Sequence, residues 1–205
     1  MHMRTFFIAA VTALFASSAF AADKSADIAR VEKYLSALTT ITADFSQTDA
    51  NGGLSEGKFY LKRPGKMRWQ YSPPTPILLV SDGKVIVYYD SELDQVNYVP
   101  MDDTLAGFLA KPVITLDSAT TKLTAFTNAD GIIRATIIQK SKPGEGSLTL
   151  ELTDKPLQLR QMVITDATGR HTGIQLQNAS FGENLPNSLF KFEDPRGATK
   201  RRPGR

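Results

Sequence analysis

Arg63 is the residue whose type and position most directly suggest a chemical role. It lies in the segment GKFYLKRPGKMRWQY, Gly57 to Tyr71, and follows Phe59 and Leu61 at intervals of two residues. Alternate residues of a strand share a face, so a cation is expected on the side of two apolar side chains. A guanidinium carries five N–H donors and needs acceptors when it is buried. Arg63 therefore either binds backbone carbonyls of a covering helix or loop, or bends back to water.

The turn between the two strands decides what lies beside this cation. A two-residue turn at Pro64-Gly65 would mix apolar and charged residues on both faces. A three-residue turn, Pro64-Gly65-Lys66, separates them better, and register follows the hydrophobic pattern. It pairs Arg63 with Met67, Leu61 with Trp69 and Phe59 with Tyr71. The result is an apolar, aromatic-rich face with Arg63 at its rim, which is either plain core or the lining of a site for an apolar ligand.

No set of residues forms a pattern typical of catalysis or metal binding. The sequence has no cysteine, His171 lies in the turn-like stretch TGRHTG, and Asp102 and Asp103 precede an apolar run as helix caps do. Cys/His metal spacing, a phosphate-binding loop and a dinucleotide fingerprint are absent, and we expect no serine to form a nucleophile elbow. We therefore predict that the protein is not an enzyme and uses no cofactor or metal.

The N-terminus has the pattern of a secretory signal peptide. Arg4 precedes an apolar run from Phe6 to Ala16, and Ala19-Phe20-Ala21 is a small-residue cleavage site. The run is too short to span a bilayer. The small net charge of +3 argues against a nucleic-acid partner. We predict a signal peptide at 1–21, one exported domain at 22–195 held by its core without disulfides, and a basic, disordered tail at 196–205.

The remaining pattern predicts about ten short antiparallel strands and few helices. A helix is predicted around Ile28, Val31, Leu35 and Leu38, a short one around Leu105 to Leu109, and a helical turn at PNSLF. The segment ILLVSDGKVIVYYD is a hairpin with Asp82-Gly83 at its tip. A long meander curls into a curved sheet or barrel, and the helices would cover one opening. The other predicted strands contain Ile41 to Phe45, Gln95 to Pro100, Ile133 to Ile137, Leu148 to Leu152, Leu159 to Val163 and Ile174 to Leu176.

Four segments, in their order along the chain, resemble the LolA family of periplasmic outer-membrane lipoprotein carrier proteins. They are ITADFSQ, EGKFYLKRPGKMRWQY, PILLVSDGKVIVYYD and TLAGFLAKP. The most specific features are Phe45 with Gln47, the pattern from Gly57 through Phe59 to Arg63-Pro64, the Arg68-Trp69 pair and Ser81 to Gly83. The resemblance covers nearly the whole chain after the signal peptide.

The resemblance implies a mainly β protein with a few helices (α+β), an incomplete, half-open antiparallel β-barrel with an α-helical lid over a hydrophobic cavity. It implies a monomeric periplasmic carrier of acylated lipoproteins, which an ATP-driven inner-membrane transporter releases and an outer-membrane acceptor receives. Arg63 matches the family's arginine that links sheet to lid. The alternative is a lipid-sensing or other lipid-binding protein on the same fold. The cavity residues implied are Phe45, Phe59, Leu61, Met67, Trp69, Tyr71, Leu105, Phe108 and Leu109.

Overall fold

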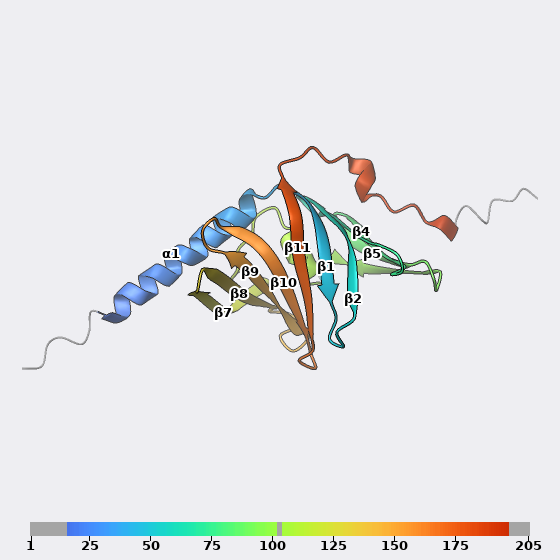
Figure 1. Ribbon diagram of the computed structural model, residues 1–205. Helices are drawn as coiled ribbons and strands as arrows, with labels where there is room; N and C mark the ends of the chain where they lie inside the picture. The colour runs from blue at the N-terminus through green and yellow to red at the C-terminus, as the bar shows by residue number, and fades with distance from the viewer. Residues whose placement is uncertain (1–15, 102–103, 197–205) are drawn as a thin grey trace, which may run out of the picture.

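The computed structural model describes residues 16–101 and 104–196, which fold around one large antiparallel sheet (Figure 1). The sheet has 11 strands in the order β6-β5-β4-β3-β2-β1-β11-β10-β9-β8-β7 and is not closed. The predicted fold class is therefore confirmed. The strands are β1 (Thr40–Thr48), β2 (Leu54–Lys62), β3 (Lys66–Tyr71), β4 (Ile77–Asp82), β5 (Val85–Asp90), β6 (Gln95–Pro100), β7 (Thr121–Ala129), β8 (Ile132–Gln139), β9 (Gly146–Thr153), β10 (Gln158–Asp166) and β11 (His171–Phe181).

Three helical elements within the described residues accompany the sheet, two α-helices and one 3-10 turn. They are α1 (Ala16–Ala37), α2 (Ala106–Leu109) and η2 (Asn187–Phe190), the last at the predicted PNSLF turn. Helix α1 starts before the predicted cleavage site and runs through it. The rest of the predicted signal peptide, residues 1–15, lies outside the described residues. So do the two predicted helix caps, Asp102 and Asp103, and the tail beyond Arg196. Within the described ranges no helix is both long and apolar enough to cross a bilayer.

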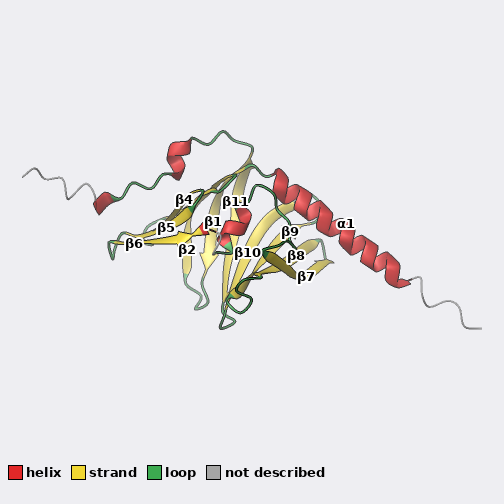
Figure 2. Cartoon of the chain, turned by 180° about the vertical axis from the view of Figure 1, so that it is seen from behind, coloured by secondary structure: helices red, strands yellow, loops and turns green. Residues whose placement is uncertain are grey.

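The order of the strands places one connection inside the curve of the sheet. Strand β1 pairs with both β2 and β11, so the two ends of the meander meet in the middle of the sheet. The two edges, β6 and β7, are then consecutive in the chain. The segment between them, which carries α2, must cross from edge to edge, and Figure 2 shows the short helix within the curve. The sheet therefore encloses its own lid segment.

One hydrophobic core fills the space between the concave face, α1 and this crossing segment. Alternate residues of β9 are buried, as expected for a strand with one face on a core. Val31 and Leu35 of α1 and Phe108 of α2 are part of the same cluster. Strand β7 was not predicted, because only Thr121 and Phe126 of its nine residues are buried and it shows no alternation.

The predicted register around Arg63 is wrong by two residues. The observed pairs are Phe59 with Trp69 and Leu61 with Met67, and the loop is Arg63-Pro64-Gly65. Backbone contacts outside the hairpin explain the difference: the Arg63 N–H donates to the Thr39 carbonyl at 2.8 Å, and the Gly65 N–H to the Ala110 carbonyl at 2.8 Å. With these bonds, Arg63 does not take part in the pairing between β2 and β3, which ends at Lys62 and Lys66. A shift of two residues preserves the faces, so the apolar face forms as predicted.

Two smaller predictions also need correction. The β4–β5 hairpin exists, but its two loop residues are Gly83 and Lys84, one position later than predicted. In β10 a register shift between Leu159 and Gln161 changes the phase of the strand. Met162 is therefore buried in place of Val163.

Candidate functional site: an apolar cavity under the lid

The concave side of the sheet contains a cavity of about 140 Å³. Its walls come from the first four strands, from the last three, and from α2. Helix α2 contributes one residue, Leu109, which lies opposite the sheet. The lining residues are Gln47, Phe59, Met67, Trp69, Tyr71, Leu79, Leu109, Leu148, Met162, Ile164 and Ile174.

Five of the nine residues predicted for the cavity lie in this lining: Phe59, Met67, Trp69, Tyr71 and Leu109. Phe45 and Leu61 are buried in the core but do not line the cavity. Leu105 and Phe108 line a separate cavity of about 220 Å³ together with Lys111 and Gln139. The prediction grouped residues of two neighbouring cavities, because sequence does not show which side of a short helix meets which part of the sheet.

The lining residues that sequence reasoning missed come mostly from the last strands. Leu148 and Ile174 were identified as strand residues, but nothing in a local pattern indicates that their strands face Trp69. Only the pairing of β1 with β11 brings the two halves of the chain together. Gln47 was noted as part of a motif and not as a cavity residue.

Four aromatic rings pack together beside β3, and three of them, Phe59, Trp69 and Tyr71, line the cavity. Trp69 stacks on Phe59 at 4.1 Å between ring centroids and meets the edge of Phe45 at 5.0 Å. Phe45 also meets Tyr71 edge to face at 5.0 Å. Gly57 makes room for this arrangement, because a Cβ there would lie 2.1 Å from the Gln70 carbonyl oxygen and 2.7 Å from the Phe45 ring.

Arg63 joins the sheet to both lid helices. Its Nε donates to the Leu109 carbonyl at 2.7 Å, and its Nη1 donates to the Leu35 carbonyl. Leu35 lies in the last turn of α1, where carbonyls have no partner within the helix and the helix dipole favours a cation. The sequence left two alternatives for Arg63, binding to backbone carbonyls or exposure to water. The structure contains the contacts with carbonyls.

The Arg63 guanidinium has no carboxylate partner within the described residues. Burial lowers its pKa to about 10, so it stays cationic at neutral pH. Its Nη2 is buried and makes no hydrogen bond within the described ranges. The contacts of Arg63 therefore join the sheet to both helices and leave one buried N–H group of the guanidinium without an acceptor among the described residues.

The opposite side of α1 is attached to β10 and to the turn before it. Arg30 forms ion pairs with Asp27 and with Asp154 of that turn. The Tyr34 hydroxyl accepts a hydrogen bond from the Leu159 N–H at 3.1 Å. Helix α1 is thus bonded to the β9–β10 side through its own side chains and to the β2–β3 side through Arg63.

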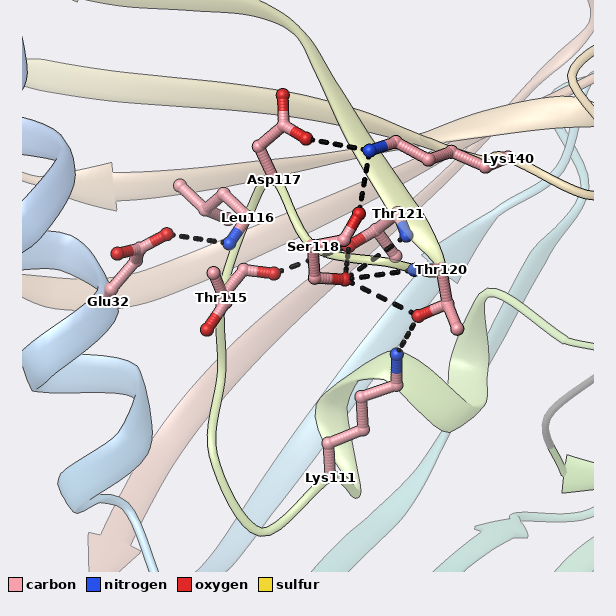
Figure 3. A network of polar contacts seen from close by, with 9 residues as sticks. All are labelled: Glu32, Lys111, Thr115, Leu116, Asp117, Ser118, Thr120, Thr121 and Lys140. Carbon is pink, nitrogen blue, oxygen red and sulfur yellow. Dashed lines mark hydrogen bonds and ion pairs between the residues drawn. The ribbon is translucent and has the colours of Figure 1, made fainter.

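The segment after α2 is bonded to α1 as well. The Leu116 N–H donates to the Glu32 carboxylate at 2.7 Å (Figure 3), and the Ile114 N–H donates to the Ser36 hydroxyl at 2.9 Å. Ile114 and Leu116 are 1% and 0% exposed. Ser118 organises the turn that follows, and Lys140 ties that turn to β8 through Asp117 at 3.0 Å. These bonds join α1 to the crossing segment.

Removing the Glu32 carboxylate and the Ser36 hydroxyl, which accept these hydrogen bonds, should loosen the crossing segment alone. In a Glu32→Ala/Ser36→Ala variant, the buried N–H groups of Ile114 and Leu116 lose their acceptors. Each unsatisfied group costs about 1–3 kcal/mol of free energy. We expect their amide hydrogen exchange to accelerate about tenfold or more while exchange in β9 stays unchanged. Glu32→Gln, which keeps an acceptor, and the exposed Lys33→Ala are the controls. Unchanged exchange at both amides would contradict the assignment.

Residue types with catalytic or metal-binding potential lie apart in the part of the chain that the structure describes. Within the described residues no three His, Cys, Asp or Glu side chains gather in a way that could hold a metal ion. His171 is exposed, and its Nδ1 lies 2.9 Å from the Thr165 hydroxyl. The sequence pattern of a nucleophile elbow, G-x-S-x-G, does occur, at Gly53–Gly57. Its Ser55 lies within β2, not on a strand-to-helix turn, and its hydroxyl oxygen lies 3.2 Å from that of Thr75.

Comparison with known proteins identifies the family. Residues 36–193 match the family of the outer membrane lipoprotein carrier protein LolA. An outer-membrane lipoprotein carrier protein of Pseudomonas aeruginosa is 32% identical over 204 residues, covering 95% of this chain and 96% of that protein. One of Pseudomonas syringae is 30% identical, covering 96% and 98%. The crystal structure of a LolA superfamily protein from Nitrosomonas europaea is 8% identical, with a TM-score of 0.45, covering 80% and 97%. The chain therefore belongs to the LolA family of outer membrane lipoprotein carrier proteins.

Proposed function

We propose that this protein is a periplasmic carrier that shields the acyl chains of lipoproteins between the inner and the outer membrane. The observation that carries this proposal is an apolar cavity closed by helices that Arg63 holds to the sheet. Family membership supports the same role, since the relatives are named as lipoprotein carriers. The protein acts by binding and release, without catalysing a reaction. The predicted signal peptide at 1–21 accounts for its export.

The physical need for such a carrier is large. Exposing a saturated chain of about 16 carbons to water costs about 13 kcal/mol of free energy, at about 0.8 kcal/mol per methylene. An acylated protein therefore does not cross an aqueous space unaided. It receives help from an ATP-driven transporter that releases it, from this carrier, and from an acceptor at the outer membrane. A single copy of the carrier suffices, since one chain encloses the cavity.

The size of the cavity indicates a closed lid. About 140 Å³ is smaller than the about 300–1,000 Å³ of ordinary ligand pockets. Cargo enters when the Arg63 contacts with Leu35 and Leu109 break and the lid moves away from β2 and β3. The bonds of Arg30 and Tyr34 retain α1 on the β9–β10 side during this opening. The crossing segment moves with α1 because Glu32 and Ser36 join them.

Binding of a hydrophobic fluorophore tests the proposal. The dye should bind saturably, a triacylated peptide should displace it, and Trp69 emission should shift on loading because this ring lines the cavity. Trp69 is the sole tryptophan of the chain, so the signal has one source. A dye that acylated peptide cannot displace, with no change in Trp69 emission, would refute the cavity as the cargo site. Hydrolysis of lipid esters by the pure protein would refute a purely carrying role.

A further inference from the structure

The cavity contains a pair of hydrogen-bonded polar side chains, Gln47 and Tyr71, in a lining that is otherwise almost wholly apolar. Gln47 is on β1 and Tyr71 on β3, so the two side chains meet across β2. On β2, Ser55 pairs with Gln47, and Gly57, which has no side chain, pairs with Tyr71. Ligand pockets commonly combine an apolar lining with a few polar groups that fix the orientation of the ligand.

The hydrogen bond between the two side chains sets the direction of the amide. The Tyr71 hydroxyl donates to Gln47 Oε1 at 2.7 Å. Burial raises the pKa of Tyr71 to about 12, so this hydroxyl keeps its proton at any physiological pH. With Oε1 occupied in this way, the two N–H donors of Nε2 point elsewhere, and they have no acceptor among the described residues. Tyr71 thus orients the Gln47 amide so that its Nε2 group is available to donate a hydrogen bond to a ligand.

Gln47 lies far along β1 from the end at which Arg63 is attached. Arg63 is bonded to Thr39, next to the start of β1, whereas Gln47 lies eight residues further on, about 26 Å along an extended strand. Phe59 and Met67 of the lining are 1% and 2% exposed, whereas Gln47, Tyr71, Leu79 and Ile164 are half-buried. The polar pair therefore belongs to the accessible part of the lining, where the linkage between acyl chains and their headgroup would lie.

We infer that Gln47, oriented by Tyr71, donates a hydrogen bond to a carbonyl oxygen of the ester or amide that links an acyl chain to the cargo. This inference rests on the proposed carrier function and assigns the cargo a chemical class. A carbonyl that enters an apolar cavity loses its water partners, and a donor at that point offsets the loss. Chains attached through a carbonyl would thus be preferred over alkyl chains attached through an ether, with the same apolar length.

The test uses two probes that differ only in this linkage, a dipalmitoylglyceryl peptide and the matching dihexadecylglyceryl ether peptide. Both compete with a bound hydrophobic fluorophore. The wild-type protein should bind the ester probe about fivefold more tightly, the effect of about one net hydrogen bond. A Gln47→Leu/Tyr71→Phe variant, which leaves no unpaired hydroxyl, should bind the ether probe as before and show no preference. With a ¹³C-labelled ester, the carbonyl stretch should lie at lower wavenumber in the wild-type complex than in the variant complex.

A matched control separates this role from a general effect of the substitution. Gln175 is on β11, exposed and opposite Ser46, so Gln175→Leu makes the same change outside the cavity and should keep the ester preference. Equal affinity of the wild-type protein for both probes, or a preference that survives in the double variant, would overturn the inference and leave the carrier function standing. Failure to bind either probe would instead refute the proposed function itself.

Discussion

An Arg63→Leu variant is expected to fold and to accept acylated cargo, but to release it to an acceptor at least about tenfold less efficiently. Arg63 donates to the carbonyls of Leu35 and Leu109, and hydrogen bonds from a charged group contribute about 1.5–3 kcal/mol each. In the proposed carrier cycle these bonds form only when the lid is closed over an empty cavity. The closed, empty state competes with the open, loaded one, and this competition expels cargo. Without Arg63 the loaded state is favoured.

The stability of this variant should change little. Arg63 has no carboxylate partner within the described residues, and its buried Nη2 has no acceptor there. The hydrogen bonds lost in Arg63→Leu are offset because the variant no longer desolvates a charge that is incompletely hydrogen-bonded. Denaturant unfolding should therefore give a free energy close to that of the wild-type protein. A variant that does not fold would show that Arg63 is a structural residue.

Two controls sharpen the release experiment. Arg63→Lys keeps the charge but loses the planar guanidinium that reaches two carbonyls at once, so its release should be impaired as well. Arg68→Leu removes another arginine bonded to a backbone carbonyl, that of Leu189, which is not part of the lid. Its release should be normal. Uptake and release are measured separately with a fluorescent acylated peptide. Normal release by Arg63→Leu would refute the role of Arg63 as a latch between the sheet and the lid.

A Gly57→Ala variant is expected to lose about 3 kcal/mol of its free energy of unfolding. The added Cβ would lie 2.1 Å from the Gln70 carbonyl oxygen, and a backbone group in a paired strand cannot move aside as a side chain can. It would also press on Phe45, against which Trp69 and Tyr71 pack. Overpacking costs about 1–3 kcal/mol, and the backbone contact places this site at the upper end. Thermal unfolding should shift down by about 6–12 °C.

Gly144→Ala is the matched control for this prediction. Gly144 has no atom within 4 Å of an added Cβ, and its backbone does not need a positive φ. The same substitution should leave the unfolding temperature within about 1–2 °C of the wild-type value. If Gly57→Ala is as stable as Gly144→Ala, strand β3 must have room that the observed pairing does not provide.

The local sequence pattern determined which residues share a face of the sheet. Alternation of apolar residues placed Phe59, Leu61, Met67, Trp69 and Tyr71 on one side, and they remain there although the predicted register was wrong by two residues. Side-chain direction in a strand has period two, so an even shift does not affect it. The same reasoning failed in β10, where a register shift changed the phase and exchanged Val163 for Met162.

The tertiary structure decided the register, the acceptors of Arg63 and the far wall of the cavity. The loop at Arg63 is fixed by bonds to Thr39 and Ala110, residues that no pattern within the hairpin contains. Leu148, Met162 and Ile174 complete the cavity only because β11 pairs with β1 and bends the last strands toward the first. Contacts between segments more than 100 residues apart depend on the curvature and closure of the whole sheet. A short-range pattern can therefore show that a residue is buried, but not what it is buried against.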